Sequence, residues 1–178
     1  MDKLSSIEQR FILHWGEMGT RWGINRTVAQ IHALLYLSPR PLNAEEIAES
    51  LSVARSNVST SLRELQNWGI VKIVHVIGDR RDHFESMKDV WEMFRVIVSE
   101  RKRREIDPTL AMLREFVAEA NKEQSPDADI KERLAEVLDF FETMTSWYEQ
   151  LSRMPTCSVI KFIKMGDKVL KLVSPPPE

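Results

Sequence analysis

The feature that most constrains this chain is residues 41–86, where two short amphipathic helices are followed by a hairpin. Asn43 and the two glutamates after it are typical of a helix start, because Asn accepts from free amides and acids are favoured in the first turn. Residues 52–54 leave room only for a tight turn before a second helix over 55–68. The pattern predicts a helix-turn-helix. The apolar positions of its first helix share one face: Ile47, Ala48 and Leu51.

The second helix has two faces of opposite character. Val58, Leu62 and Leu65 repeat at spacings of three and four, which predicts the packed side. Hydroxyl, amide and guanidinium groups occupy the rest of the surface and suit base edges and phosphates in a major groove. The alternative is a solvated polar face without a ligand. The candidate DNA contacts on this helix are Arg55, Ser56, Asn57, Ser59, Thr60 and Arg63.

A basic hairpin follows the helix-turn-helix directly. Residues 70–77 are rich in β-branched side chains, Gly78-Asp79 is a turn pair, and 82–85 predict a shorter returning strand. The tip carries Arg80 and Arg81, which suit phosphate or minor-groove contact beside the helix. The fold class predicted is mainly α with a small β-wing, a winged helix-turn-helix plus a helical dimerisation region. The partner predicted is double-stranded DNA.

Four motifs between residues 22 and 105 resemble one known family. They are Trp-Gly-Ile-Asn-Arg from Trp22, Leu-Ser-Val-Ala-Arg-Ser-Asn-Val-Ser from Leu51, Gly-Asp-Arg-Arg-Asp-His-Phe from Gly78 and Lys-Asp-Val-Trp-Glu-Met-Phe from Lys88. The segment resembles winged-helix regulators of the MarR superfamily, in the branch typified by the repressor of glycine betaine synthesis. The resemblance implies a DNA-binding transcriptional regulator, most often a repressor, that is dimeric and released by a small effector.

Ala54 departs from the family pattern. Such proteins often place there a Ser that caps the recognition helix, and Ala cannot accept a hydrogen bond. Either Ser52 or an unaided turn must therefore begin this helix.

An effector site is implied by the resemblance. In this superfamily effectors bind where the winged domain meets the dimerisation helices, and members of this branch look like sensors of choline-type quaternary ammonium compounds. Aromatic faces attract such a cation by about 0.5 to 2 kcal/mol each. The candidate residues for such a site are Trp15, Trp22, Trp91 and Phe94. The alternative is that the tryptophans among them are ordinary core residues.

Helical patterns lead into the winged helix. Apolar spacing predicts one helix over 5–18 and another over 26–37, the second ended by Ser-Pro-Arg-Pro. We expect Gly16, Gly19 and Gly23 to loosen the stretch between them.

Further helices follow the wing. A helix from Lys88 is expected to finish in the basic cluster 101–104, and Asp107-Pro108 reads as the cap and first turn of a new helix. Residues 129–153 carry an apolar stripe too long for one small core. Helices of a second subunit are its natural partner, so the sequence predicts a homodimer.

The domain organisation follows from these patterns. We expect a winged helix-turn-helix DNA-binding domain over residues 20–100 and a helical dimerisation region over 1–19 and 101–173. The proline-rich tail, residues 174–178, is expected to be disordered.

Composition excludes several classes of protein. The 178 residues carry a net charge of -2, but residues 55–81 contain five basic and two acidic side chains, a modest local excess. The single cysteine, Cys157, excludes an internal disulfide, and no apolar run is long enough for a membrane span. Neither a signal peptide nor a cofactor, metal or catalytic motif is evident, so we expect a cytoplasmic protein that is not an enzyme.

Two other functions remain open at this stage. A winged helix can serve as a protein-interaction module, which would favour exposed apolar residues where residues 55–67 show polar ones. An architectural DNA binder without an effector would lack a solvent-reachable pocket near Trp22 and Trp91.

Overall fold

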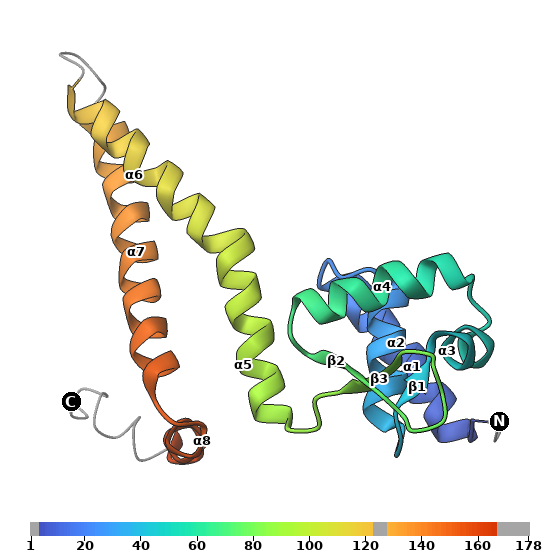
Figure 1. Ribbon diagram of the computed structural model, residues 1–178. Coiled ribbons are helices and arrows are strands. Elements are labelled where there is room, and N and C mark those ends of the chain that lie inside the picture. The colour runs from blue at the N-terminus through green and yellow to red at the C-terminus, as the bar shows by residue number, and fades with distance from the viewer. Residues whose placement is uncertain (1–3, 123–127, 167–178) are drawn as a thin grey trace. The chain divides into compact units, whose positions relative to one another are not determined.

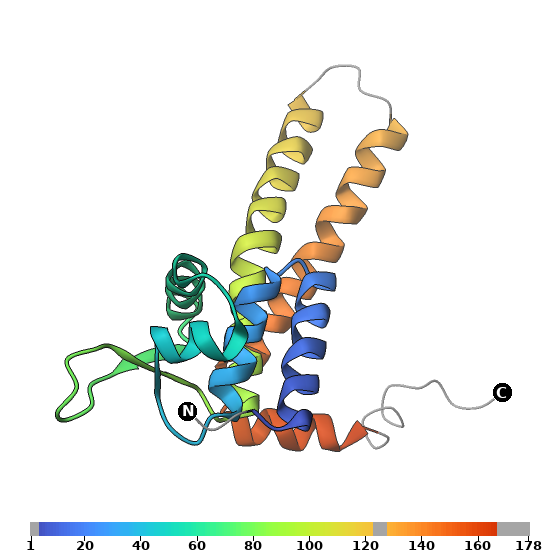
Figure 2. The same cartoon turned by 90° about the vertical axis from the view of Figure 1, so that its right-hand side faces the viewer.

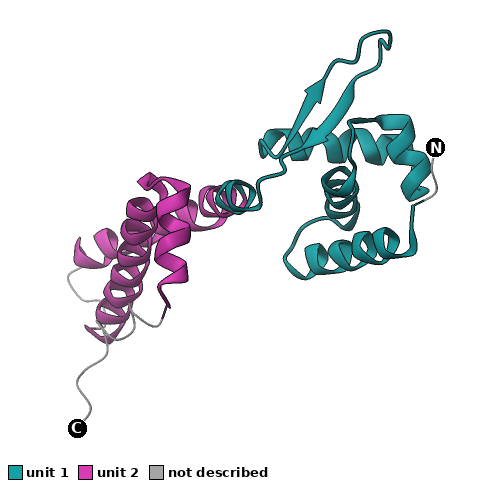
Figure 3. Cartoon of the chain, turned by 90° about the horizontal axis from the view of Figure 1, so that it is seen from below, with its two compact units in different colours: residues 1–96 teal, residues 97–178 magenta. Residues whose placement is uncertain are grey.

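The computed structural model describes residues 4–122 and 128–166. The chain divides into two compact units, Met1–Val96 and Ile97–Glu178, coloured separately in Figure 3. The predicted fold class is confirmed, since the described residues are mainly helical with one small antiparallel sheet.

Side-chain caps fix the starts of three helices in the first unit. Ser5 and Asn43 each close a capping box with the glutamate three residues later, and Asn25 accepts from the amides of Thr27 and Val28. Ala54, before the fourth helix, has no such bond. These helices, labelled in Figure 1, are α1 (Ser6–Arg21), α2 (Arg26–Leu37), α3 (Ala44–Leu51) and α4 (Arg55–Asn67).

A three-stranded sheet joins the helix-turn-helix to the wing. Its order is β1-β3-β2, with both pairs antiparallel, and β1 pairs Leu42 with Phe84 and Asn43 with His83. The two residues of β1 precede α3 directly, so the wing is hydrogen-bonded to the start of the helix-turn-helix. The strands are β1 (Leu42–Asn43), β2 (Val71–Val74) and β3 (His83–Ser86).

The core of the first unit is built around α2. This helix contacts α1, α3, α4 and β3, and Ile31 and Leu35 are almost inaccessible to solvent. Burial of an aliphatic side chain of this size contributes about 1.5 to 3 kcal/mol. Other large apolar side chains that are fully buried are Ile47 on α3, Val58 and Leu65 on α4, and Ile70 just before β2.

The expectation that glycines loosen the chain after the first helix is wrong for two of them. Gly16 and Gly19 are buried within α1, which runs on to Arg21. A Cβ on Gly19 would lie 2.6 Å from the Cβ of Ala29 on α2. Both glycines therefore let two helices approach closely. Gly23, with φ of +74°, does form the turn.

The described residues of the second unit are mainly helical. Helix α5 (Val90–Arg101) crosses the boundary between the units and continues through a π-helical turn, η1 (Lys102–Ile106), into α6 (Asp107–Lys122). Helix α7 (Ala128–Arg153) packs antiparallel along α6, as Figure 2 shows, and α8 (Thr156–Lys164) follows.

The expected helix restart at Asp107-Pro108 is wrong. Asp107 keeps helical dihedral angles, and the π-turn before it accommodates Pro108, which cannot donate a hydrogen bond. The basic cluster 101–104 consequently lies inside a continuous helix, where Arg103 pairs with Glu100 and Lys102 with Asp107. It does not end a helix.

The boundary between the two compact units falls after Val96. Helix α1 packs on α2 and so belongs to the first unit. The assignment of residues 1–19 and 101–173 to a dimer interface stays a prediction. The expected tail, residues 174–178, lies outside the described residues.

Candidate nucleic-acid interface

Helix α4 is held firmly on one side. Val58, Leu62 and Leu65 are at most 2% exposed, as the spacing predicted, and Ser61 is buried between them. The buried face fixes the rotation of α4 about its axis, and with it the set of side chains that face outward.

The opposite face of α4 is open to solvent. All six side chains that the sequence indicated on this helix are exposed: Arg55, Ser56, Asn57, Ser59, Thr60 and Arg63. Ala54 begins the helix in an extended conformation without a side-chain cap. Amides at such a helix start suit a phosphate oxygen. Ser52 adopts a left-handed conformation, φ 53°, and ends α3 instead of capping α4.

The arginines of α4 differ in their ion pairs. The Nη2 of Arg55 lies 2.6 Å from the Oε1 of Glu45 on α3. Arg63 forms no ion pair with any described residue. Arg63 therefore carries an uncompensated positive charge on the outward face, and Arg55 shares its charge with a carboxylate.

The two wing arginines also differ. The Nε of Arg81 donates to both carboxylate oxygens of Asp79, at 3.0 and 3.1 Å, and the backbone amide of Arg81 donates to the same carboxylate. These bonds hold the pKa of Asp79 well below its usual range. Arg80, exposed next to them, has no ion pair among the described residues. The wing thus presents one free and one compensated guanidinium group.

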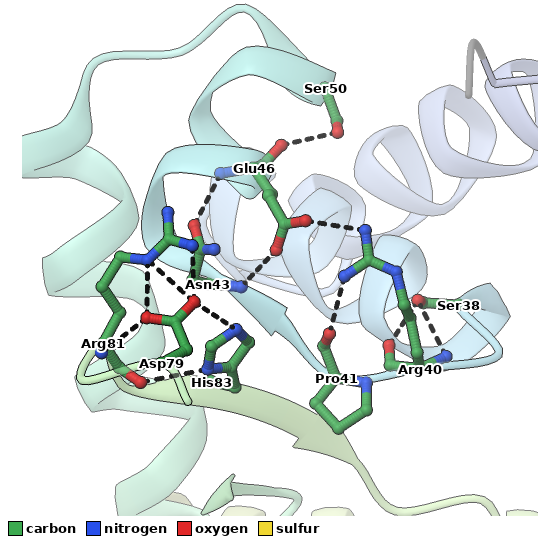
Figure 4. Close-up of polar contacts among 9 residues, drawn as sticks. All are labelled: Ser38, Arg40, Pro41, Asn43, Glu46, Ser50, Asp79, Arg81 and His83. Carbon is green, nitrogen blue, oxygen red and sulfur yellow. Dashed lines mark hydrogen bonds and ion pairs between the residues drawn. The ribbon is translucent and has the colours of Figure 1, made fainter. Parts of the chain in front are cut away.

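His83 connects the wing to the helix-turn-helix. Its ring nitrogen Nδ1 lies 3.0 Å from the backbone oxygen of Arg81, and its Nε2 lies 3.6 Å from Oδ2 of Asp79 (Figure 4). Its strand partner Asn43 closes the capping box with Glu46, which in turn binds Arg40. The sequence did not indicate Asp79 and His83 as part of this site. The signal for them was that an acid, an arginine and a histidine lie two residues apart in the hairpin.

A lysine that follows the wing in the chain was also missed. The Nζ of Lys88 donates to the backbone oxygens of Leu35, Tyr36 and Ser38, at 2.9, 2.7 and 2.8 Å. A cation that binds the last carbonyls of a helix satisfies them and opposes the negative end of its dipole. Lys88 therefore ties the segment after the wing to the end of α2.

The four aromatic residues considered for an effector lie in the first unit. Trp15 stacks on Phe11, with ring centroids 5.3 Å apart, and Trp91 is half-buried near the start of α5. Trp22 and Phe94 are 52% and 54% exposed. Trp22 and Phe94 therefore each leave about half of their surface exposed to solvent in the single chain.

The described residues contain no group of three or more His, Cys, Asp and Glu arranged to hold a metal ion. Cys157 is a free, exposed thiol. No helix in the described part of the chain is long and apolar enough to cross a membrane.

Comparisons with known proteins agree with this geometry. Residues 22–82 match the model of the MarR family. The HTH-type transcriptional repressor GbsR of Bacillus subtilis is 25% identical over 154 residues, which cover 83% of this chain and 85% of that protein. The putative HTH-type transcriptional regulator YvaV of the same organism is 25% identical over 182 residues, covering 98% of each chain.

A solved structure shares the fold. The crystal structure of a transcriptional regulator superposes with a TM-score of 0.63 at 20% identity, covering 82% of this chain and 95% of that one. The winged helix-turn-helix of this chain thus matches the MarR family, and its fold is shared with that regulator. Over most of its length the chain is also similar to the curated regulators GbsR and YvaV.

Proposed function

We propose that this protein is a sequence-specific repressor that binds DNA as a homodimer. The observation that carries the proposal is the exposed polar face of α4, with the free charge of Arg63, next to a wing that exposes Arg80. Helix α4 would enter the major groove, and the wing would contact the adjacent backbone or minor groove. The repressor role is transferred from the relative named as a repressor.

Each of the eight exposed side chains has a role in this proposal. The short polar groups of α4, together with Arg55 and Arg63, contact base edges, and the wing arginines contact phosphates. The two wing arginines of each subunit give a dimer about four phosphate contacts of this kind, hence a log–log salt slope of about -4. The eight residues are Arg55, Ser56, Asn57, Ser59, Thr60, Arg63, Arg80 and Arg81.

The dimer is supported by apolar surface in the second unit. Phe140, Met144 and Trp147 on α7 are each at least 51% exposed, and Phe116 on α6 is 44% exposed. Surface of this kind is characteristic of an interface between subunits. Light scattering should give twice the mass of one chain.

The test is fluorescence anisotropy on a labelled duplex from immediately upstream of the gene, at two salt concentrations and with excess unrelated DNA. We expect binding that survives the competitor. Arg80→Ala should weaken binding to all sequences and reduce the salt slope by about one per contact removed, whereas Arg63→Ala should change the preferred base at one position by about tenfold. Arg133→Ala, which removes an exposed charge from α7, is the matched control and should bind normally.

Two results would contradict the proposal. Unchanged binding by both Arg63→Ala and Arg80→Ala would exclude this surface. Binding that disappears with competitor DNA would leave only a general electrostatic attraction.

Release by a choline-like effector is a further part of the proposal, supported by the resemblance and by the aromatic residues Trp15, Trp22, Trp91 and Phe94. Such a ligand would lower DNA affinity by favouring a dimer whose two reading helices no longer match the half-sites. Adding choline to the same assay tests it.

A further inference from the structure

We infer that His83 is a positioning residue for DNA binding, whose doubly protonated ring locks the wing of this chain against the start of its helix-turn-helix. The inference rests on the proposed DNA-binding function and adds a proton-dependent contact to it.

The first step concerns the ring nitrogen Nδ1 of His83. It lies 3.0 Å from the backbone oxygen of Arg81. A carbonyl oxygen can only accept, so Nδ1 must carry a hydrogen and donate. This bond alone fixes one tautomer of the neutral ring, in which Nε2 holds a lone pair.

The second step concerns Nε2. It faces Oδ2 of Asp79 at 3.6 Å. The bonds from Arg81 keep the pKa of that carboxyl low, so Asp79 is an acceptor too. A neutral ring would place its lone pair against a carboxylate, which is repulsive. A proton on Nε2 turns this contact into an ion pair, so the imidazolium satisfies both neighbours.

The surroundings of His83 supply the compensating charge. The ring is 5% exposed and lies in β3 between its strand partners Asn43 on β1 and Val74 on β2. The charged groups that face it are Asp79 and Arg81 on the wing and Glu46 at the start of α3. Figure 4 shows these side chains converging from the wing and from α3.

The consequence for DNA binding follows from the connections of Asp79. The same carboxylate binds the side chain and the amide of Arg81, and Arg80 lies next to it in the chain. Protonated His83 therefore ties the loop that presents Arg80 to β1, and so to the helix-turn-helix. A wing held in place before binding loses less entropy on the DNA.

The test has a part that needs no DNA. In an NMR titration of the free protein from pH 8 to pH 6, the Nε–H signal of Arg81 and the carboxyl carbon of Asp79 should shift with the same midpoint as the His83 ring. Signals that stay fixed while the His83 ring titrates would overturn the inference.

The second part measures affinity for the upstream duplex over the same pH range at constant ionic strength. We expect the wild type to bind about threefold to fivefold more tightly at pH 6. His83→Asn retains a donor for the Arg81 carbonyl but has no group in place of Nε2, so it should lose this pH dependence. His75→Asn, an exposed histidine on the same hairpin, is the matched control and should keep it.

The outcomes separate this inference from the proposed function. Coupled NMR titration without DNA binding would refute the function, and the role of His83 in DNA binding with it. DNA binding with equal pH dependence in the wild type and His83→Asn would overturn the role of His83 alone.

Discussion

Acid should destabilise the first unit through His32, a buried histidine on α2. The ring is 4% exposed, its Nε2 has no hydrogen-bond partner among the described residues, and it lies near the rings of Trp15 and Tyr36. Burial, with a smaller contribution from the positive charge of Lys88, lowers the pKa of His32 from 6.5 to about 4.

The sign and size of the effect follow from this pKa. The folded state binds the proton less readily than the unfolded state, so the unfolding free energy is greatest above pH 6.5 and falls as the pH approaches 4. The full shift corresponds to about 3 kcal/mol, and about 2 kcal/mol of it is lost by pH 5.

Urea unfolding at pH 8 and pH 5, followed by tryptophan fluorescence, measures this loss. Four of the five tryptophans lie in the first unit, so the signal reports mainly on it. His32→Phe removes the titrating group at similar volume and should lose about 2 kcal/mol less than the wild type between these pH values. His14→Phe, at an exposed position of α1, should behave as the wild type does.

Equal losses in the wild type and His32→Phe would refute the reasoning. His83 is unchanged in all three proteins, so any contribution from it cancels in the comparison.

Two further changes test the local structure around the interface. Lys88→Met should lower the unfolding free energy by about 1.5 to 3 kcal/mol, because three helix-end carbonyls lose a charged donor; urea unfolding measures it, and a change below about 0.5 kcal/mol would contradict the capping role. Ala54→Ser should raise stability by about 0.5 to 2 kcal/mol in the same assay by supplying the missing cap of α4. An unchanged value would mean that the α4 amides are already satisfied.

The local sequence pattern was sufficient to predict helix α4 and which of its sides is buried. The spacing of Val58, Leu62 and Leu65 sets which side of α4 is buried, and the polar positions then face outward by helix geometry alone. The wing was similarly predicted from β-branched residues around a glycine turn. These signals arise within a few residues of one another and need no knowledge of tertiary contacts.

Contacts between distant segments were not predictable. Strand β1 has only two residues, too few for any periodicity, and Lys88 binds carbonyls about fifty residues earlier in the chain. The buried glycines of α1 carried a misleading signal. Glycine disfavours a helix locally, and at Gly19 the close approach of α2 outweighs that preference.

In the proposed interface, the distribution of charge would allow a chain of net charge -2 to bind DNA selectively. Of the five basic residues between 55 and 81, three are paired in the structure: Arg55 with Glu45, Lys72 with Glu85 and Arg81 with Asp79. These carboxylates cancel much of the attraction that any DNA would feel, because attraction to phosphates does not depend on sequence. The remaining attraction to DNA comes from Arg63 and Arg80. The short polar groups of α4 contribute only at contact distance. The proposed interface would therefore discriminate by fit at the base edges, and non-specific binding would be reduced more than specific binding.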